Sequence, residues 1–155
     1  MNELVFRNLS EDAKRQICAW KYGGEYDLYN LPAYEEMQVR QIGFMNPKSE
    51  KNYYGFWDES ILVGFVNILE EKEEVFIGIG VNPDLCNKHY GQRMLLITYE
   101  ISKKLYPNKP LYLEVRTWNI RAVKCYQKAG FRIDGQAYAL TTGIGTGTFY
   151  RMIRE

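Results

Sequence analysis

The segment Val81–Leu96 carries residues that suit a phosphate-binding turn. The apolar run at residues 75–81 predicts a buried strand, and Pro83 ends that strand because proline has no N–H to donate. From Gly91 onward, apolar residues recur at helical spacing. A strand, a tight loop and a helix N-terminus gather backbone N–H groups at the positive end of the helix dipole, and Lys88 adds a charge. The sequence therefore predicts a site for a phosphate or pyrophosphate group.

Further along the chain, a strand and a helix place several polar side chains. The strand expected at residues 111–115 alternates, so Glu114 lies on the face opposite the apolar one. A helix follows, capped near Asn119 and ended by Gly130 as a left-handed residue. Residues 141–147 are rich in glycine but lack a strand-to-helix context, which indicates a flexible hairpin loop between the last two strands.

The N-terminal part predicts two helices and three strands. Ser10, followed by two acidic residues, caps a first helix that continues through Trp20 and stops at Gly23–Gly24. The other expected elements are an edge strand at residues 4–6, a helix from 33 to about 44, and hairpin strands at 53–57 and 61–69.

Composition narrows the class of protein. A chain of 155 residues with 46% apolar and 15% aromatic residues predicts one ordered domain, residues 1–155. The net charge of +1 is spread along the chain, so no nucleic-acid partner is expected. No apolar run reaches the length of a membrane span, and the N-terminus, including Met1 and Asn2, lacks the features of a signal peptide. We therefore expect a cytoplasmic protein with no membrane partner.

The cysteines and the histidine limit other chemistries. Cys18, Cys86 and Cys125 have no CxxC spacing, which favours reduced thiols in a cytosolic protein. His89 is the only histidine, so no metal site is expected, and no hydrolase triad is supported around it.

The spelling of the turn is similar to the acetyl-CoA loop of the GNAT superfamily of N-acetyltransferases, on the run Val81-x-Pro83-x-Leu85-x-x-Lys88-x-Tyr90-Gly91. In that superfamily, a Val-x-Pro strand end leads into Gln/Arg-x-x-Gly-x-Gly/Ala. Here Cys86 stands at the Gln/Arg position and His89 at the first glycine.

A second motif resembles the C-terminal half of the same superfamily, on the run Leu113-Glu114-Val115-Arg116-x-x-Asn119-x-Arg121-Ala122-x-x-x-Tyr126-x-Lys128-x-Gly130-Phe131. Enzymes that acetylate the N-terminal amine of a ribosomal protein share its Leu-Glu-Val-Arg-x-x-Asn part and its spacing from Glu to Tyr. The two motifs together cover about residues 75–133, in the expected order.

The resemblance implies a fold, a cosubstrate and a set of binding residues. The fold is α/β (α+β), a twisted, mixed and mainly antiparallel sheet of six to seven strands with about four helices on both faces. Acetyl-CoA would place its pantetheine arm where the strands ending at Val81 and Val115 splay apart. The implied acetyl-CoA residues are Ile79, Val81, Asn87, Lys88, His89, Tyr90, Gly91, Gln92, Asn119 and Tyr126.

Acetyl transfer to an amine assigns roles to the second motif. The amine must lose a proton, because a primary amine has a pKa of about 10.4 in water, and Glu114 is the best-placed carboxylate. Backbone N–H groups near Val81 would stabilise the oxyanion. Tyr126 would protonate the leaving thiolate, because a phenol with a pKa of about 10 stays protonated at neutral pH.

Each of these residues also has a structural interpretation. Glu114 could form a cross-strand ion pair, and Tyr126 could be a core aromatic. Asn119 is at least a helix cap. If the backbone at His89 has positive φ, the residue is strained but tolerable, and its ring could stack on acetyl-CoA or narrow the loop. Glu74 lies one residue away from the position of a known superfamily base, on the opposite face, and receives no catalytic role.

The acceptor site is left open between two interpretations. The superfamily usually shapes this site from the N-terminal region, where aromatic side chains gather, but ordinary packing of helices on a sheet is the favoured explanation for them. These side chains are Trp20, Tyr22, Tyr26, Tyr29 and Tyr34. The acidic run at residues 70–74 could attract a cationic acceptor or be a solvated hairpin tip.

The sequence as a whole predicts direct transfer of an acetyl group from acetyl-CoA to a primary amine. The acceptor could be a small molecule, a protein N-terminus or a lysine side chain, and the protein a monomer or homodimer. One alternative is a non-catalytic acyl-CoA-binding or regulatory module, motivated by Cys86 and His89. Another is a structural protein that no longer binds the cosubstrate.

Overall fold

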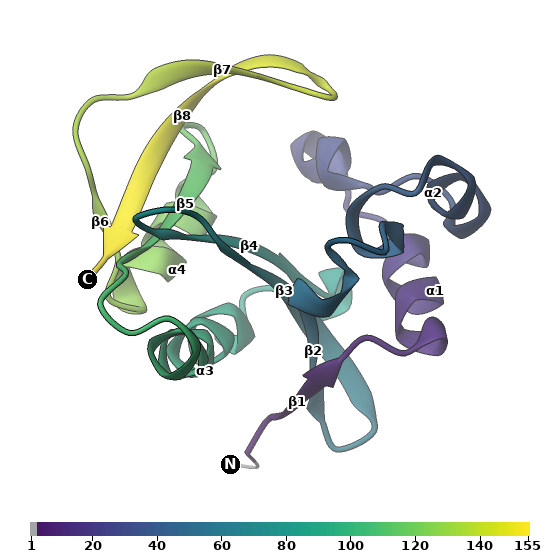
Figure 1. The fold of residues 1–155 in the computed structure, drawn as a ribbon. Helices are drawn as coiled ribbons and strands as arrows, with labels where there is room; N and C mark the ends of the chain where they lie inside the picture. The colour runs from purple at the N-terminus through teal and green to yellow at the C-terminus, as the bar shows by residue number, and fades with distance from the viewer. Residues whose placement is uncertain (1–2) are drawn as a thin grey trace. The chain divides into compact units, whose positions relative to one another are not determined.

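The structure, a computed structural model, describes residues 3–155 (Figure 1). Met1 and Asn2 lie outside the described residues. They were among the residues from which the absence of a signal peptide was predicted. The α-helices of the described chain are α1 (Glu11–Ala19), α2 (Tyr34–Arg40), α3 (Tyr90–Leu105) and α4 (Ile120–Lys128). Its strands are β1 (Val5–Asn8), β2 (Tyr53–Asp58), β3 (Ile61–Glu70), β4 (Val75–Val81), β5 (Leu111–Arg116), β6 (Arg132–Ile133), β7 (Tyr138–Thr142) and β8 (Gly145–Arg154).

The chain divides into two compact units, and strands β3 and β4 run from one unit into the other. Unit 1 comprises the residues up to Asn67 together with Ile79–Tyr90. Unit 2 comprises Ile68–Gly78 and Gly91–Glu155.

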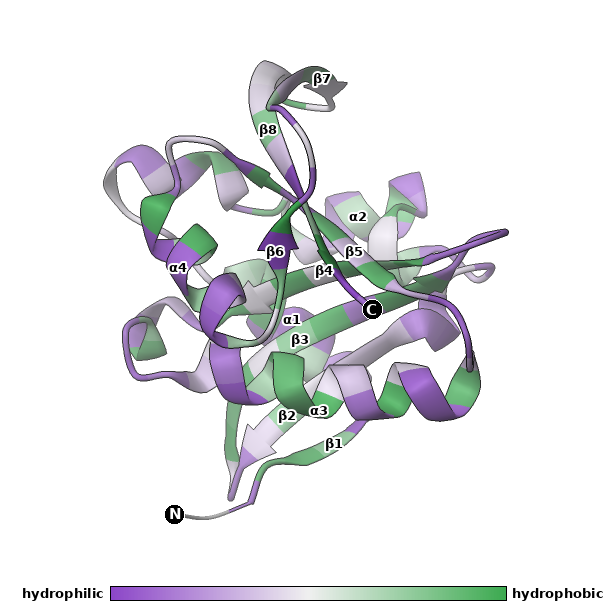
Figure 2. Ribbon diagram, turned by 90° about the vertical axis from the view of Figure 1, so that its left-hand side faces the viewer, coloured by the Kyte–Doolittle hydropathy of each residue, from purple (hydrophilic) through white to green (hydrophobic). Residues whose placement is uncertain are grey.

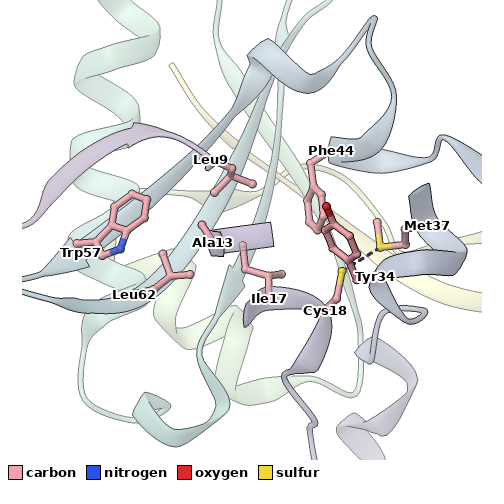
Figure 3. Packing of buried hydrophobic residues seen from close by; sticks show 9 residues of the cluster. All are labelled: Leu9, Ala13, Ile17, Cys18, Tyr34, Met37, Phe44, Trp57 and Leu62. Atoms are coloured by element: carbon pink, nitrogen blue, oxygen red, sulfur yellow. Dashed lines mark hydrogen bonds between the residues drawn. The ribbon is translucent and has the colours of Figure 1, made fainter. Parts of the chain in front are cut away.

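Unit 1 is built on three strands and two helices. Strands β1, β2 and β3 pair antiparallel in that order. Ser10 caps α1 as predicted, because its Oγ accepts a hydrogen bond of 3.1 Å from the Ala13 N–H. Apolar side chains of α1, α2 and the strands form one buried cluster (Figure 3), which contains Leu9, Ala13, Ile17, Cys18, Tyr34, Met37, Phe44, Trp57 and Leu62.

Unit 2 combines parallel and antiparallel pairing. Strand β4 pairs parallel to β5, β5 pairs antiparallel to β8, and β8 also pairs with β6 and β7. Leu111 and Arg154 are partners across β5 and β8 and therefore share a face. On that face, the Arg154 guanidinium lies 3.6 Å from the Tyr99 ring of α3 and donates to the Ala129 carbonyl at the end of α4 (3.0 Å). Both helices therefore cover the apolar face of β5.

Helix α3 has the amphipathic character expected of a helix with one buried side. Met94 and Leu95 are completely buried, whereas Leu96 is 42% exposed. Figure 2 shows hydrophobic and hydrophilic segments alternating along this helix. The mixed pairing and the helices confirm the predicted α/β class.

The strand count was too low in the sequence prediction. The described residues contain eight strands rather than six or seven. The segment after α4 breaks in two, because Gly135 adopts a φ of +78° between β6 and β7. The predicted glycine-rich hairpin is present, but its turn is shorter than residues 141–147, since Thr142 and Gly145 already pair.

Two predicted helices end earlier than expected. Trp20 is extended (φ −64°, ψ 134°) instead of helical, and its ring lies 6.3 Å from that of Phe65. The second helix ends at Arg40, not near Phe44, because Gln41 adopts a φ of +52°. By contrast, β4 has the predicted bounds, Val75–Val81.

Candidate active site

Asn82 fixes the start of the loop between β4 and α3. Its backbone N–H donates to the Val63 carbonyl (2.9 Å) and its side-chain Nδ2 to the Leu62 carbonyl (3.1 Å), both on β3. Its Oδ1 accepts from the Asp84 N–H (3.0 Å), and its carbonyl accepts from the Leu85 N–H (2.8 Å). One residue, through its backbone and its side chain, therefore sets the direction in which the chain leaves the strand.

The next part of the loop has the left-handed backbone conformation that glycine residues usually adopt. Asn87 and His89 both have a φ of +66°, with the exposed Lys88 between them. A positive φ at His89 was considered from the sequence, and the structure shows this conformation. The backbone of His89 is therefore strained, since the left-handed region favours glycine. Helix α3 begins at the next residue, Tyr90, and its first-turn N–H groups have no intrahelical partner. This backbone arrangement fits a pyrophosphate, and Lys88 supplies a nearby cation.

Tyr90 secures the end of this loop. Its hydroxyl donates to Asp58 Oδ2 over 2.6 Å, which joins the loop to the turn between β2 and β3. We predicted Tyr90 as a cosubstrate residue, and the structure shows that its phenol holds the loop in place. Asp58 was not predicted.

A second tyrosine reaches the end of β4 from the N-terminal region. The Tyr22 hydroxyl donates to the Val81 carbonyl (2.7 Å), and the Tyr22 N–H donates to Asn30 Oδ1 (2.6 Å). Gly80 precedes Val81, and a Cβ there would overlap the ring of Phe65. The two ends of segment 22–30 are therefore joined by a hydrogen bond. The Tyr22 hydroxyl also attaches this segment to the end of β4, for which cosubstrate binding was predicted.

The aromatic side chains of the N-terminal region fall into different environments. Tyr34 is buried in the core cluster, and its hydroxyl donates to Glu11 Oε2 (2.6 Å). Trp20 instead packs on Phe65, whose ring also lies 6.4 Å from that of Tyr53. Packing accounts for Tyr34 and Trp20, as the simpler interpretation expected.

In unit 2, the predicted base Glu114 has a specific partner. Its Oε2 accepts a hydrogen bond of 2.5 Å from the Tyr138 hydroxyl of β7. Burial, followed by this hydrogen bond, raises the pKa of Tyr138, so its phenol stays protonated at neutral pH. Glu114 is half-buried on the face of β5 that points away from α3 and α4.

Neighbouring carboxylates on the same face are paired with cations or with a phenol. Arg151 donates to both Glu74 oxygens (2.6 and 2.9 Å) and to Asp134 Oδ2 (3.1 Å), and the Glu74 hydrogen bond is the main cause of its raised pKa. Tyr112 donates to Glu71 Oε1 (2.7 Å). Glu74 is therefore structural, consistent with its lack of a predicted catalytic role, and much of the acidic run is paired rather than solvated.

Helix α4 positions the predicted acid, Tyr126. Asn119 caps the helix as predicted, with Oδ1 accepting from the Ala122 N–H (3.2 Å). Gly130 has the predicted positive φ (+98°), and its N–H and that of Phe131 bond to Gln127 and Tyr126 carbonyls (both 3.0 Å). Both ends of the helix are thus fixed, and Tyr126, which lies between them, is half-buried.

The two predicted catalytic residues lie on opposite sides of β5. Tyr126 belongs to α4, which covers the apolar face, whereas Glu114 belongs to the polar face. The recorded pairing of β4 with β5 covers Val75–Leu111 and Phe76–Tyr112, although β5 continues to Arg116. These pairs end before the position of Glu114.

The model of the acetyltransferase (GNAT) family matches residues 10–131, which include both motifs. The chain belongs to the GNAT acetyltransferase family. It is therefore an acyltransferase. Among curated proteins, no sequence matches this chain.

Solved GNAT structures share the fold over almost the whole chain. A GNAT-family acetyltransferase from Bacillus anthracis has a TM-score of 0.80 at 16% identity, covering 98% of this chain and 94% of its own. A chimeric spermidine N-acetyltransferase from Vibrio cholerae and hSSAT has a TM-score of 0.76 at 19% identity, covering 99% and 95%. A GNAT acetyltransferase from Streptococcus pneumoniae has a TM-score of 0.69 at 23% identity, covering 98% of both chains.

The predicted GNAT site residues are divided between the two units. Unit 1 brings together the β4 end and the loop, with Ile79, Val81, Asn87, Lys88, His89 and Tyr90. Unit 2 holds the first turn of α3 and the β5–α4 segment, with Gly91, Gln92, Glu114, Asn119 and Tyr126. Gly91 is buried and Gln92 half-buried, whereas Asn87, Lys88 and His89 are exposed.

Three hydrogen-bond partners of the predicted site residues were not predicted in that role: Asp58, Tyr138 and Tyr22, which was considered from the sequence only for the acceptor site. Each acts through a hydrogen bond to a residue at least 24 positions away in sequence. No local spacing encodes such a pairing. The alternation of larger and smaller side chains in Tyr138-Ala139-Leu140 was the available sign that Tyr138 lies on one face of a strand.

Metal-binding groups, disulfides and membrane-spanning helices are further features of the described residues that bear on function. Residues 3–155 contain no group of three His, Cys, Asp or Glu side chains able to hold a metal ion. All three cysteines are free. None of the described helices has the length and apolar character needed to cross a membrane.

Proposed function

We propose that this chain is a single N-acetyltransferase domain that transfers the acetyl group of acetyl-CoA directly to a primary amine. The observation that carries the proposal is the placement of Glu114 and Tyr126 on opposite sides of β5, next to the point where pairing with β4 stops. A thioester bound beside β5 would have a base on one side of this strand and an acid on the other.

Each residue has one task in this reaction. Glu114 removes a proton from the acceptor amine, directly or through a water. Tyr126 gives a proton to the departing thiolate and takes up a proton from solvent before the next turnover. Backbone N–H groups at the β4 end, near Ile79 and Val81, stabilise the developing oxyanion. No covalent enzyme intermediate is needed.

The loop before α3 binds the pyrophosphate of acetyl-CoA. The proposal rests on the backbone conformation of Asn87 and His89, on the first turn of α3 beginning at Tyr90 and continuing through Gly91 and Gln92, and on the Lys88 charge. Asn119 contributes a further contact from the N-terminus of α4.

For the acceptor, a small polyamine or amino compound ranks ahead of a protein N-terminal amine and a lysine side chain. Glu25 and Asp27 are exposed in the 3-10 segment Gly24–Tyr29, next to half-buried Tyr26. Carboxylates and aromatic rings together suit a cationic amine. The spermidine acetyltransferases that share the fold act on such an amine. We place the enzyme in the cytoplasm, as a monomer or homodimer.

The test measures CoA thiol release from acetyl-CoA with three acceptors: spermidine, a peptide with a free N-terminal amine, and an N-blocked peptide with one lysine. Thiol release that depends on one of these amines is the expected result. Glu114→Gln should lower kcat by about 100-fold, while Glu100→Gln, at an exposed glutamate of α3, should leave it unchanged. No amine-dependent release with any acceptor, or a fully active Glu114→Gln, would contradict the proposal.

A further inference from the structure

Strand β7 carries a side chain across β8 to Glu114. Tyr138 pairs with Phe149 of β8, and Phe149 pairs in turn with Arg116 of β5. Side chains of paired residues share a face, so Tyr138, Arg116 and Glu114 all lie on the polar face of unit 2. From there, the Tyr138 hydroxyl reaches diagonally over β8 to Glu114 Oε2 at 2.5 Å.

The cation nearest to Glu114 in the sheet is already in use. Arg151 is the direct cross-strand partner of Glu114. Its guanidinium, however, is bound by both Glu74 oxygens and by Asp134, at 2.6 to 3.1 Å. Among the described residues, Tyr138 is the hydrogen-bond partner recorded for the Glu114 side chain, and no ion pair to this carboxylate is recorded.

A neutral donor on one oxygen has a particular consequence. A carboxylate has two oxygens that can accept about four hydrogen bonds in all, so one phenol fixes its orientation and leaves the second oxygen available. A bidentate guanidinium, as on Glu74, would occupy both oxygens and hold the negative charge in an ion pair. The Glu114 environment is therefore suited to a carboxylate that must accept a proton.

We propose that Tyr138 is a positioning residue that holds Glu114 in the orientation in which its free oxygen receives the acceptor's proton. This inference rests on the proposed role of Glu114 as the base. The β7–β8 hairpin thus contributes to catalysis through one hydroxyl, without touching the reacting atoms. The raised pKa of Tyr138 keeps this hydroxyl a donor throughout the neutral range.

The test is a double-mutant cycle with acetyl-CoA and the most active of the three acceptors named above. Its members are the unaltered protein, Tyr138→Phe, Glu114→Gln and the double variant. Tyr138→Phe should lower kcat about tenfold, the size of one hydrogen bond to a charged group, with the KM for acetyl-CoA unchanged. In the Glu114→Gln background, the same change should have no further effect on kcat.

Tyr99→Phe is the matched control. It removes a tyrosine hydroxyl in the same unit, one that donates to the Glu155 carbonyl (2.8 Å), and should leave kcat unchanged. Thermal unfolding of each variant checks that the fold is retained. A Tyr138→Phe protein with unaltered kcat, or one whose loss persists in full in the Glu114→Gln background, would overturn the positioning role alone. A fully active Glu114→Gln protein would instead overturn the base on which it rests.

Discussion

The loop before α3 and the β5–α4 segment differ in the atoms that carry their proposed chemistry. In the loop, two family positions hold other residues, Cys86 and His89, yet the backbone still turns with a φ of +66° at His89. In β5–α4, the side chains themselves match the family motif; Glu114 accepts a hydrogen bond from Tyr138, and Tyr126 lies in a helix that is fixed at both ends.

This difference separates binding from catalysis. A pyrophosphate is recognised by backbone N–H groups and a helix dipole, which any residue able to adopt the conformation can supply. Proton transfer needs a carboxylate or a phenol at a defined place, which no backbone group replaces. The loop should therefore tolerate substitution, whereas β5–α4 should not.

The largest effect is expected from removing the phenol of Tyr126. Tyr126→Phe keeps the ring and its packing but leaves the thiolate without its acid, so kcat should fall by about 100-fold. The KM for acetyl-CoA should change little, since the loop binds the pyrophosphate and the ring of Tyr126 is retained. Steady-state kinetics of thiol release measures both constants. A fully active Tyr126→Phe enzyme would contradict the assignment of catalysis to the β5–α4 side chains, because Tyr126 would then contribute to packing alone.

The smallest effect is expected at His89. A left-handed conformation costs a non-glycine residue about 1–2 kcal/mol, and glycine's extra chain entropy offsets part of the gain. His89→Gly should therefore raise the melting temperature by about 2 °C and change acetyl-CoA affinity less than threefold. Asn87→Gly, at the same φ of +66°, is the matched control and should gain less, because asparagine tolerates this conformation.

Calorimetry of unfolding and a binding titration measure these two quantities. If His89→Gly lowers acetyl-CoA affinity tenfold or more, the imidazole itself contacts the ligand. That outcome would contradict the assignment of binding to the backbone.

Local chemistry explains which parts of the fold were predictable. The bounds of β4 follow from an uninterrupted apolar run ended by Pro83, and those of α4 from the cap Asn119 and the left-handed Gly130. These features depend on residues close in sequence. Glu114 and Tyr126 were predictable for a different reason, since they belong to a family motif.

The remaining features depend on strand register, which local pattern does not determine. Tyr138 meets Glu114 because β5 and β7 both pair with β8 at a particular register. Trp20 leaves the helical conformation to pack on Phe65, which lies 45 positions later in the sequence. The break between β6 and β7 is different, because it falls at Asp134-Gly135, a dipeptide typical of turns, and was therefore visible in the sequence although it was not predicted.

The most direct test of the account is thermal unfolding of the unaltered protein with acetyl-CoA, free CoA or ATP. A ligand at 100 times its Kd stabilises the native state by about 2.7 kcal/mol, which raises the melting temperature of a domain of this size by about 5 °C or more. The account predicts such a shift with acetyl-CoA and CoA, and a smaller one or none with ATP. No shift at millimolar acetyl-CoA would show that a loop with Cys86 and His89 does not bind the cosubstrate, and would contradict the account.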